Sequence, residues 1–149
     1  MTRLTAPHSV LFACTLNAVR SPMAEGLARQ MLPHHVYVSS AGLRKSDVDG
    51  FAVAVMREVG IDIADHEPQA LQEADTGSFD LVVALSPEAE VFASAATRAT
   101  ATEIEFWEVP DLSGAGESRE RRLEAFRSVR DLLRRRIRAR FLAPELPQG

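Results

Sequence analysis

Two runs of apolar residues mark the strongest strand signals in the chain, at Ser9–Ala13 and Phe79–Leu85. Both runs are continuous rather than alternating, which is typical of strands buried on both faces of a parallel sheet. Two weaker runs, at His35–Ser39 and Glu103–Trp107, predict two further strands. The pattern therefore predicts four strands spread over most of the chain.

Helical patterns fill the intervals between these strands. In the first interval we expect a helix at Pro22–Leu32, with Ser21 as its N-cap and Pro22 in the first helical position. In the second interval we expect a helix at Gly50–Val59 that ends at Gly60, a residue suited to a left-handed C-terminal cap.

Two more helices are expected in the second half of the chain, from Pro87 to about Thr97 and from Glu117 to about Phe141. In the last helix, apolar positions recur at helical spacing and form one stripe. The stripe comprises Leu123, Phe126, Val129 or Arg130, Leu133, Ile137 and Phe141. Strands and helices in alternation predict right-handed crossovers and a doubly wound α/β fold, in which ligands bind beyond the carboxyl ends of the strands.

Composition narrows the range of functions. The chain has 149 residues, of which 46% are hydrophobic and 26% charged, as in an ordinary globular domain. We expect a single domain over residues 1–149, with residues 1–8 and 143–149 as flexible termini, in a monomer or weak dimer. The formal net charge of −4 gives no general attraction to nucleic acid or to an anionic membrane, so neither partner is expected.

Cys14 is the only cysteine in the sequence. It can form no disulfide within the chain and no paired-cysteine metal site, so we expect a cytoplasmic location and no metal or cofactor. The apolar run before it is too short for a signal segment or a membrane span.

The position of Cys14, at the end of a buried strand and before a helix, favours a catalytic role. A short loop between strand and helix directs backbone N–H groups inward, and the helix dipole adds to this field, so the loop suits an oxyanion such as phosphate. The same field favours the thiolate, and comparable settings lower a thiol pKa from about 8.5 to roughly 3.5–7.5. Arg20 can bind two phosphate oxygens with its planar fork, and Ser21 can cap the helix or donate to the thiolate. A lone cysteine is more commonly an inert buried residue. Here, however, the loop, Cys14, Arg20 and Ser21 each have a role in one mechanism, which favours the catalytic interpretation.

The stretch CTLNAVRSPMAEG resembles the phosphate-binding loop of the low-molecular-weight protein tyrosine phosphatase family, whose pattern is C-x-x-N-x-x-R-S-P followed by a helix with Ala-Glu. Ser40-Ala41-Gly42 resembles the S-A-G that follows the second strand of that family. Further likenesses lie at Phe51–Leu71 and at Phe79-Asp80-Leu81.

The resemblance implies a four-stranded parallel sheet with helices on both faces and the phosphate-binding loop after the first strand. It also implies a reaction in which Cys14 attacks the phosphorus of a phosphomonoester, Arg20 binds the phosphoryl oxygens and Asp111 protonates the leaving group before activating water. The implied substrate-binding loop comprises Thr15, Leu16, Asn17, Ala18, Val19 and Arg20. The implied supporting hydrogen-bond network comprises Asn17, Ser21, Ser40 and His66.

The sequence departs from the family pattern at several points. Leu16 replaces a usual glycine, and Val19 replaces a cysteine found in many members, so no disulfide can protect Cys14. Ser86 occupies the place of a usual Asp. The aromatic residues that commonly follow the acid are missing, because Asp111 is followed by Leu112, Ser113 and Gly114, and this weakens the case for phosphotyrosine as the substrate.

We therefore expect a cysteine-dependent phosphomonoester hydrolase that acts on a phosphorylated protein or a small phosphomonoester through a phosphocysteine intermediate. One alternative is an arsenate reductase that uses an external thiol and a glutaredoxin-like partner, since the thioredoxin-coupled route needs two more cysteines. Another is a module that binds phosphorylated partners without turnover. The last helix region holds ten of the 17 basic residues, and we interpret them as a solvated helix face rather than a nucleic-acid or acidic-partner site.

Overall fold

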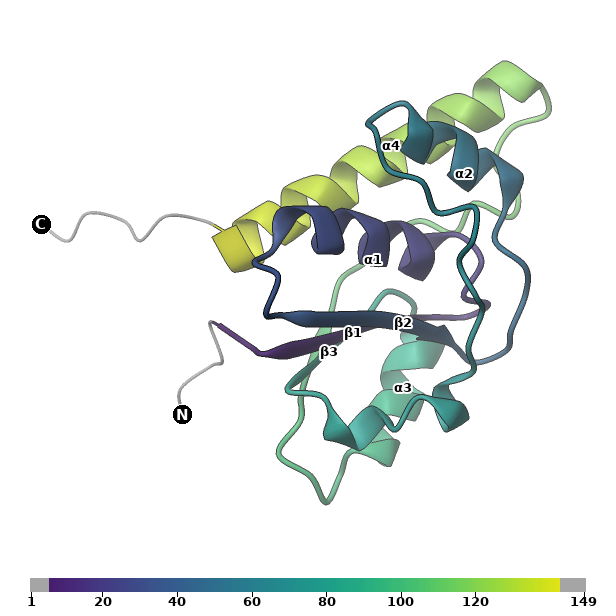
Figure 1. Ribbon diagram of the computed structural model, residues 1–149. Coiled ribbons are helices and arrows are strands. Elements are labelled where there is room, and N and C mark those ends of the chain that lie inside the picture. The colour runs from purple at the N-terminus through teal and green to yellow at the C-terminus, as the bar shows by residue number, and fades with distance from the viewer. Residues whose placement is uncertain (1–5, 143–149) are drawn as a thin grey trace, which may run out of the picture.

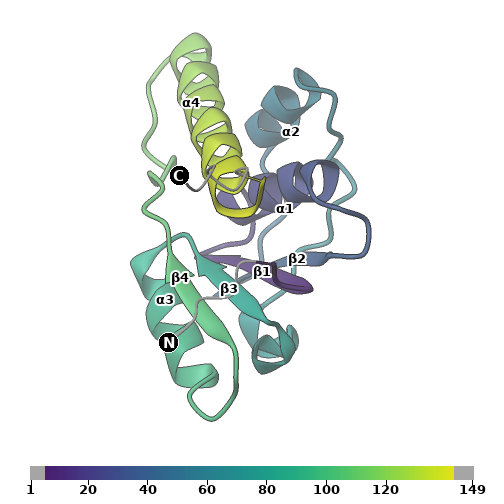
Figure 2. The same ribbon diagram turned by 90° about the vertical axis from the view of Figure 1, so that its left-hand side faces the viewer.

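Four parallel strands form the centre of the molecule, in a computed structural model that describes residues 6–142 (Figures 1 and 2). The strands are β1 (Ser9–Cys14), β2 (Tyr37–Gly42), β3 (Leu81–Ala84) and β4 (Glu103–Phe106). Their order in the sheet is β2-β1-β3-β4, and every neighbouring pair is parallel. All four predicted strands are present, and each starts within about two residues of its expected start. Strand β2 continues past its expected end at Ser39, to Gly42.

Helices cover both faces of this sheet, as the figures show from two directions. Helices α1 (Arg20–Met31), α2 (Gly50–Arg57) and α4 (Arg119–Ile137) lie on one side, and α3 (Pro87–Ala96) lies on the other. Short 3₁₀ turns precede β3, and a π-helical turn at Arg138–Leu142 extends α4. The predicted α/β class, with a parallel four-stranded sheet between helices, is confirmed.

The central strand β1 divides the core between the two faces. Val10, Phe12 and Cys14 belong to the core shared with α1 and α4, whereas Leu11 and Ala13 belong to the core under α3. Successive side chains of a strand point to opposite faces, so this alternation follows from the pleat. It places the Cys14 side chain on the α1 side of the sheet.

The start of α1 corrects one prediction from the sequence. The helix begins at Arg20, Val19 occupies the N-cap position, and Ser21 lies inside the first turn rather than capping it. Pro22 is tolerated there because the first four N–H groups of a helix have no intrahelical partner, so its missing N–H removes no bond. The hydroxyl of Ser21 is consequently available to the active-site loop.

Other helix ends follow the expected chemistry. Gly60 has a φ of +81°, and the N–H of Ile61 reaches back to the Met56 carbonyl at 3.0 Å, as in a left-handed C-terminal cap. Asp49 caps α2 through the N–H groups of Phe51 and Ala52.

Arginines of α4 serve partly as structural residues. Arg130 is buried and donates to the Val55 carbonyl at 2.8 Å and to Glu58 at 2.9 Å, while Arg127 also binds Glu58. Hydrogen bonds from these two arginines lower the pKa of Glu58 to about 2. The α4 apolar stripe from Leu123 to Ile137 is buried as predicted.

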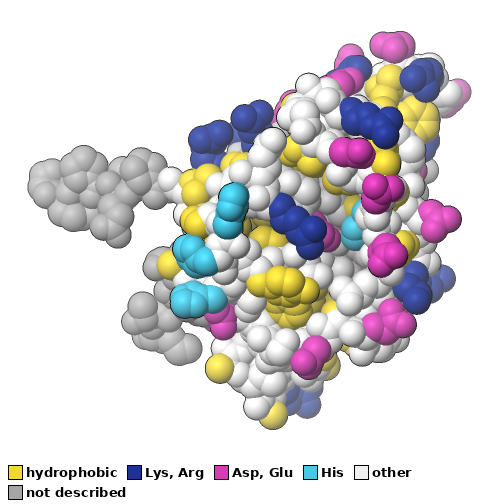
Figure 3. All heavy atoms as spheres, in the orientation of Figure 1, with side chains coloured by type: hydrophobic (Ala, Val, Ile, Leu, Met, Phe, Trp, Pro, Cys, Tyr) yellow, Lys and Arg dark blue, Asp and Glu magenta, His cyan; other side chains and the backbone are white. Residues whose placement is uncertain are grey.

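Exposed arginines of the same region are Arg119, Arg121, Arg134, Arg135, Arg136 and Arg138. On the face in Figure 3, basic and acidic side chains are interspersed rather than gathered into one basic band. The exposure of these six arginines agrees with a solvated helix face.

Near the N-terminus, His8 is held by hydrogen bonds from its N–H to Asp80 at 2.8 Å and from the Tyr37 N–H to its carbonyl at 2.8 Å. The remaining residues expected to be flexible, 1–5 and 143–149, lie outside the described part. Within residues 6–142, every helix is too short or too polar to span a bilayer.

Candidate active site

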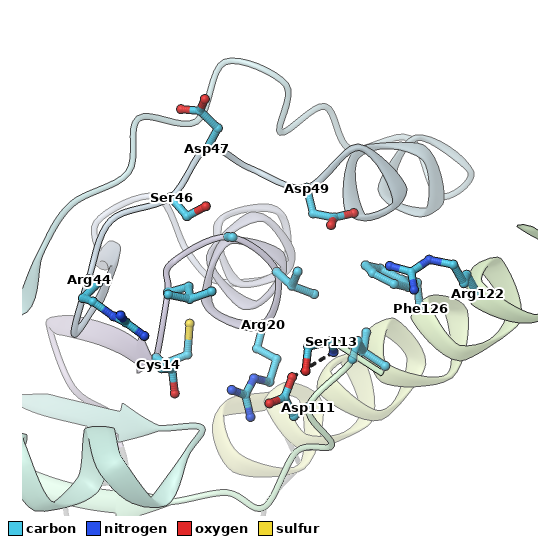
Figure 4. A pocket seen from close by; sticks show the side chains of 15 residues that line it. Cys14, Arg20, Arg44, Ser46, Asp47, Asp49, Asp111, Ser113, Arg122 and Phe126 are labelled. Carbon is cyan, nitrogen blue, oxygen red and sulfur yellow. Dashed lines mark hydrogen bonds between the residues drawn. The ribbon is translucent and has the colours of Figure 1, made fainter. Parts of the chain in front are cut away.

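A pocket of about 390 Å³ lies at the carboxyl edge of the sheet and brings together Cys14, Arg20 and Asp111 (Figure 4). Cys14 is the last residue of β1, Arg20 is the first of α1, and Asp111 follows β4 on the way to α4. Parallel strands end at the same edge of a sheet, so residues that follow β1 and β4 converge there. Residues far apart in sequence thus share one site.

The backbone of the loop between Cys14 and Arg20 is fixed from outside. The carbonyls of Cys14, Thr15 and Ala18 accept hydrogen bonds from Leu43, Arg44 and Asp49, at 2.9–3.1 Å, in the segment after β2. With its carbonyls turned outward, the loop keeps its N–H groups for a ligand. Within residues 6–142, four of these N–H groups donate to no other protein group: those of Thr15, Leu16, Ala18 and Val19.

Gly42, at the end of β2, permits this close approach. A Cβ atom there would lie 2.5 Å from the Asn17 nitrogen, 2.7 Å from the Leu16 carbonyl carbon and 2.8 Å from the Arg44 oxygen. All three neighbours are backbone atoms, so none can move aside as a side-chain end can. The glycine of the S-A-G motif is therefore needed because it has no side chain that would collide with the loop.

The sulfur of Cys14 has hydrogen-bond partners both within the loop and on α1. The Asn17 N–H lies 3.3 Å from Sγ, and the Ser21 Oγ lies 2.8 Å from it. The Ser21 hydroxyl also lies 3.5 Å from the Ala41 carbonyl, a longer contact. The sulfur therefore lies at the N-terminal end of α1, within hydrogen-bond distance of the loop backbone.

Asn17 holds the loop in its curved form. Its φ of +56° lies in the left-handed region, which Asn tolerates better than most residues. Its buried side-chain amide donates to Ser21 at 2.8 Å and to Ser40 at 3.0 Å. Its Oδ1 accepts from His66 Nε2 at 3.1 Å and from the Gln69 N–H at 2.9 Å.

The network continues through the carboxylate of Glu25, which contacts Ser40, Arg29 and His66. Ser40 donates to Glu25 at 2.5 Å, Glu25 pairs with Arg29 at 2.8 Å, and His66 Nδ1 lies 3.7 Å from Glu25. Burial lowers the pKa of His66, with the Glu25 carboxylate opposing that shift. The four residues expected to support the loop are thus hydrogen bonded in one cluster, with His66 at its outer end.

Thr15 connects the loop to the other face of the sheet. Its hydroxyl donates to Ser86 at 3.2 Å, and the buried Ser86 also accepts from the Ala89 N–H as the N-cap of α3. Serine is small enough for both contacts, where the family pattern has an Asp.

Arg20 and Asp111 lie beside each other at the mouth of the loop. Arg20 Nη1 donates to the carbonyls of Leu85 at 3.2 Å and Val109 at 3.1 Å. Asp111 accepts from the Ser113 N–H at 2.9 Å, and this bond is the main cause that lowers the pKa of Asp111, with a smaller contribution from Arg20. The carboxylate form of Asp111 is therefore favoured in the free protein.

The structure also shows pocket residues that the sequence did not indicate. They come from the segment after β2 and from α4, and comprise Arg44, Ser46, Asp47, Asp49, Arg122 and Phe126. The signal that could have found the first four is topological, since the segment after β2 must leave the sheet beside the loop after β1.

A family model described as low molecular weight phosphotyrosine protein phosphatase matches residues 9–146. The chain belongs to this family. The match extends over nearly the whole chain and confirms the family that the loop motif resembles.

Individual relatives of this phosphatase-family chain carry two kinds of name. A glutaredoxin arsenate reductase of Synechocystis sp. is 33% identical over 138 residues, covering 86% of this chain and 92% of the relative. A solved arsenate reductase in its oxidized state is 31% identical with a TM-score of 0.76, covering 89% of this chain and 95% of that one. The tyrosine phosphatase Wzb of Escherichia coli K30 shares the fold, with 24% identity, a TM-score of 0.76 and coverage of 89% and 95%.

Proposed function

We propose that the protein is a cysteine-dependent phosphomonoesterase that acts through a phosphocysteine intermediate. The observation that carries this proposal is the single pocket lined by Cys14, Arg20 and Asp111. A nucleophile, a cation with a planar fork and a carboxyl group are sufficient for both halves of the reaction, without a second cysteine.

In the first half, the Cys14 thiolate attacks phosphorus, and the bond between phosphorus and the leaving oxygen breaks. The free N–H groups of the loop and the Arg20 guanidinium stabilise the charge on the transferring phosphoryl group. The leaving oxygen takes a proton from Asp111. Asp111 is a carboxylate in the free protein, and the negative charge of a phosphate bound beside it raises its pKa and favours the protonated form.

The second half begins with Asp111 as a carboxylate, because its proton has gone to the leaving oxygen. It removes a proton from water, the water oxygen attacks phosphorus, and the bond between phosphorus and Sγ breaks. Inorganic phosphate leaves, and Sγ returns to a thiolate supported by Asn17 and Ser21. Asp111 then releases the proton it took from water to solvent, and the cycle has restored Cys14 and Asp111 to their starting forms.

Arsenate reduction is the second candidate, favoured by the 33% identity with a glutaredoxin arsenate reductase. In that reaction Cys14 attacks arsenate and water leaves. An external thiol then attacks Sγ, and the electrons of the bond between sulfur and arsenic leave with arsenic as arsenite. The resulting mixed disulfide on Cys14 needs a glutaredoxin-like dithiol for its reduction, since the chain has one cysteine.

One pair of assays separates the two functions. Phosphate release from p-nitrophenyl phosphate is measured with chelator present, and arsenite formation is measured with glutathione and glutaredoxin, for wild type and Cys14→Ser. We expect phosphate release by wild type only. Arsenite formation without phosphate release would favour the second candidate, and activity that survives in Cys14→Ser would contradict both.

A further inference from the structure

The pocket is lined by charged side chains of both signs. They are Arg20, Arg44, Asp47, Asp49, Asp111 and Arg122. Whether any of them can contact a substrate beyond its phosphate depends on which ones already have partners.

Most of these charges are engaged within the protein. Asp49 accepts from the Phe51 N–H at 2.7 Å, and Asp111 accepts from the Ser113 N–H. Arg122 donates to the Ala115 carbonyl at 3.3 Å and lies over the Phe51 ring, 5.0 Å from its centroid. Such contacts hold these groups in place.

Arg44 and Asp47 differ from the other charged residues of the pocket. Among the described residues, neither side chain makes a hydrogen bond or ion pair, and both are exposed. In Figure 4 the guanidinium of Arg44 points toward Cys14, whereas the carboxylate of Asp47 points away from it. Among the pocket residues from the segment after β2, Arg44 is thus a cation that remains available to a ligand.

The backbone of Arg44 is tied to the phosphate loop itself. Its N–H donates to the Thr15 carbonyl at 3.0 Å, one residue after Cys14. This bond fixes the starting point of the side chain relative to the nucleophile, although its end is free. A group bound by Arg44 therefore sits at a defined side of the phosphate site.

We propose that Arg44 determines specificity by binding a second anionic group, a carboxylate or phosphate, on the leaving-group side of a phosphomonoester substrate. This inference rests on the proposed function of the pocket and names its substrate class. Guanidinium groups bind carboxylates and phosphates through two parallel hydrogen bonds. Leu112 and Ser113 carry no aromatic ring, and Phe126, the one aromatic residue among those that line the pocket, is buried in the core, so recognition of the leaving group depends on polar contacts.

Binding of substrate analogues tests this without turnover. Calorimetric dissociation constants are measured for benzylphosphonate and for its meta- and para-carboxylated forms, with wild type, Arg44→Gln and Arg44→Lys. We expect wild type to bind the better carboxylated isomer about three- to tenfold more tightly than benzylphosphonate. Arg44→Gln should abolish this preference and leave benzylphosphonate affinity within about twofold of wild type, and Arg44→Lys should restore part of the preference.

Lys45→Gln is the matched control, because Lys45 is an exposed neighbouring cation that does not line the pocket and pairs with Glu73 at 3.4 Å. It removes the same charge and should keep the preference. The inference is overturned if wild type shows no preference for either carboxylated isomer, or if Lys45→Gln loses it as fully as Arg44→Gln does.

The two proposals fail differently in these measurements. Benzylphosphonate reports on the phosphate loop alone, whereas the ratio between the analogues reports on Arg44. Tight binding of benzylphosphonate without a carboxylate preference contradicts the role of Arg44 and leaves the phosphatase proposal standing. Absence of benzylphosphonate binding to the folded protein contradicts both.

Discussion

Arg20 donates from Nη1 to the backbone carbonyl of Val109 at 3.1 Å, across 89 positions of the sequence. Val109 precedes Asp111 by two residues, so Arg20 also holds the segment that carries Asp111. In the proposed reaction, phosphate binding and proton transfer are therefore coupled through one guanidinium. The predictions below separate these contributions.

Arg20→Lys should reduce kcat/KM for p-nitrophenyl phosphate by on the order of 10²–10³-fold, because an ammonium group keeps the charge but loses the planar fork. The variant also loses the simultaneous contacts to Leu85 and Val109. Steady-state kinetics with Arg57→Lys as a control, on the exposed end of α2, provide the comparison. An Arg20→Lys enzyme with nearly full activity would show that charge alone is sufficient.

Asp111→Asn should slow hydrolysis most for substrates with poor leaving groups, because these need the proton that Asp111 supplies. We expect a loss of about 10²–10⁴-fold with alkyl phosphates and a smaller loss with p-nitrophenyl phosphate. Rates across a series of aryl and alkyl phosphates measure this dependence, with Asp47→Asn as the control. Equal losses across the series would remove Asp111 from the role of acid.

Gly42→Ala should displace the phosphate loop, since its new Cβ would meet three backbone atoms at 2.5–2.8 Å. Such overpacking costs about 1–3 kcal/mol of stability, and a loop shift near 1 Å reduces turnover by about a hundredfold. Gly50→Ala is the matched control, because a Cβ at Gly50 meets nothing within 4 Å. Thermal unfolding and phosphatase activity of the two variants should differ clearly, and equal behaviour would refute the close-packing argument.

His66 should make stability depend on mildly acidic pH. Burial lowers its pKa in the folded protein, with Glu25 and Glu67 opposing the shift and Arg29 adding to it. The unfolded chain then binds more protons, so the free energy of unfolding is highest above pH 6.5 and falls as pH drops below that value. Glu58 also affects stability, because its pKa is lowered from 4.5 to about 2 in the folded protein. Its contribution to the free energy of unfolding changes only below pH 4.5, so the effect of His66 is measured above that pH.

The measurement compares denaturant unfolding of wild type and His66→Gln between these two pH values. Glutamine keeps an amide donor near Asn17 but does not titrate, so the variant should lose less stability on acidification. Identical pH profiles would show that His66 does not carry this dependence.

The fold followed from sequence because its signals are local. Continuous apolar runs such as Ser9–Ala13 and the stripe on α4 are fixed by their own periodicity, and both are found where expected. The error at Ser21 arose because a Ser-Pro pair suits two positions, at the cap or within the first turn. The bond between Ser21 and Cys14, which uses the Ser21 hydroxyl, depends on tertiary structure.

Only part of the candidate site could be predicted from the sequence. Cys14, Arg20 and the network around Asn17 follow from a short motif and its family resemblance, whereas Arg44 lies in a segment with no periodicity. That segment is positioned by backbone bonds from Arg44 to Thr15 and from Asp49 to Ala18, which join residues about 30 positions apart. No local pattern encodes such contacts, so its share of the pocket required the structure.

The most direct test of the phosphatase account is a search for phosphate on Cys14 during turnover. Asp111→Asn, which should slow breakdown of the intermediate, is mixed with p-nitrophenyl phosphate, quenched rapidly and analysed by peptide mass spectrometry. The account predicts that the peptide containing Cys14 gains the mass of one phosphoryl group, and that Cys14→Ser in the same background shows no such transient gain coupled to nitrophenol release. Steady turnover with Cys14 unmodified at every time point would contradict it.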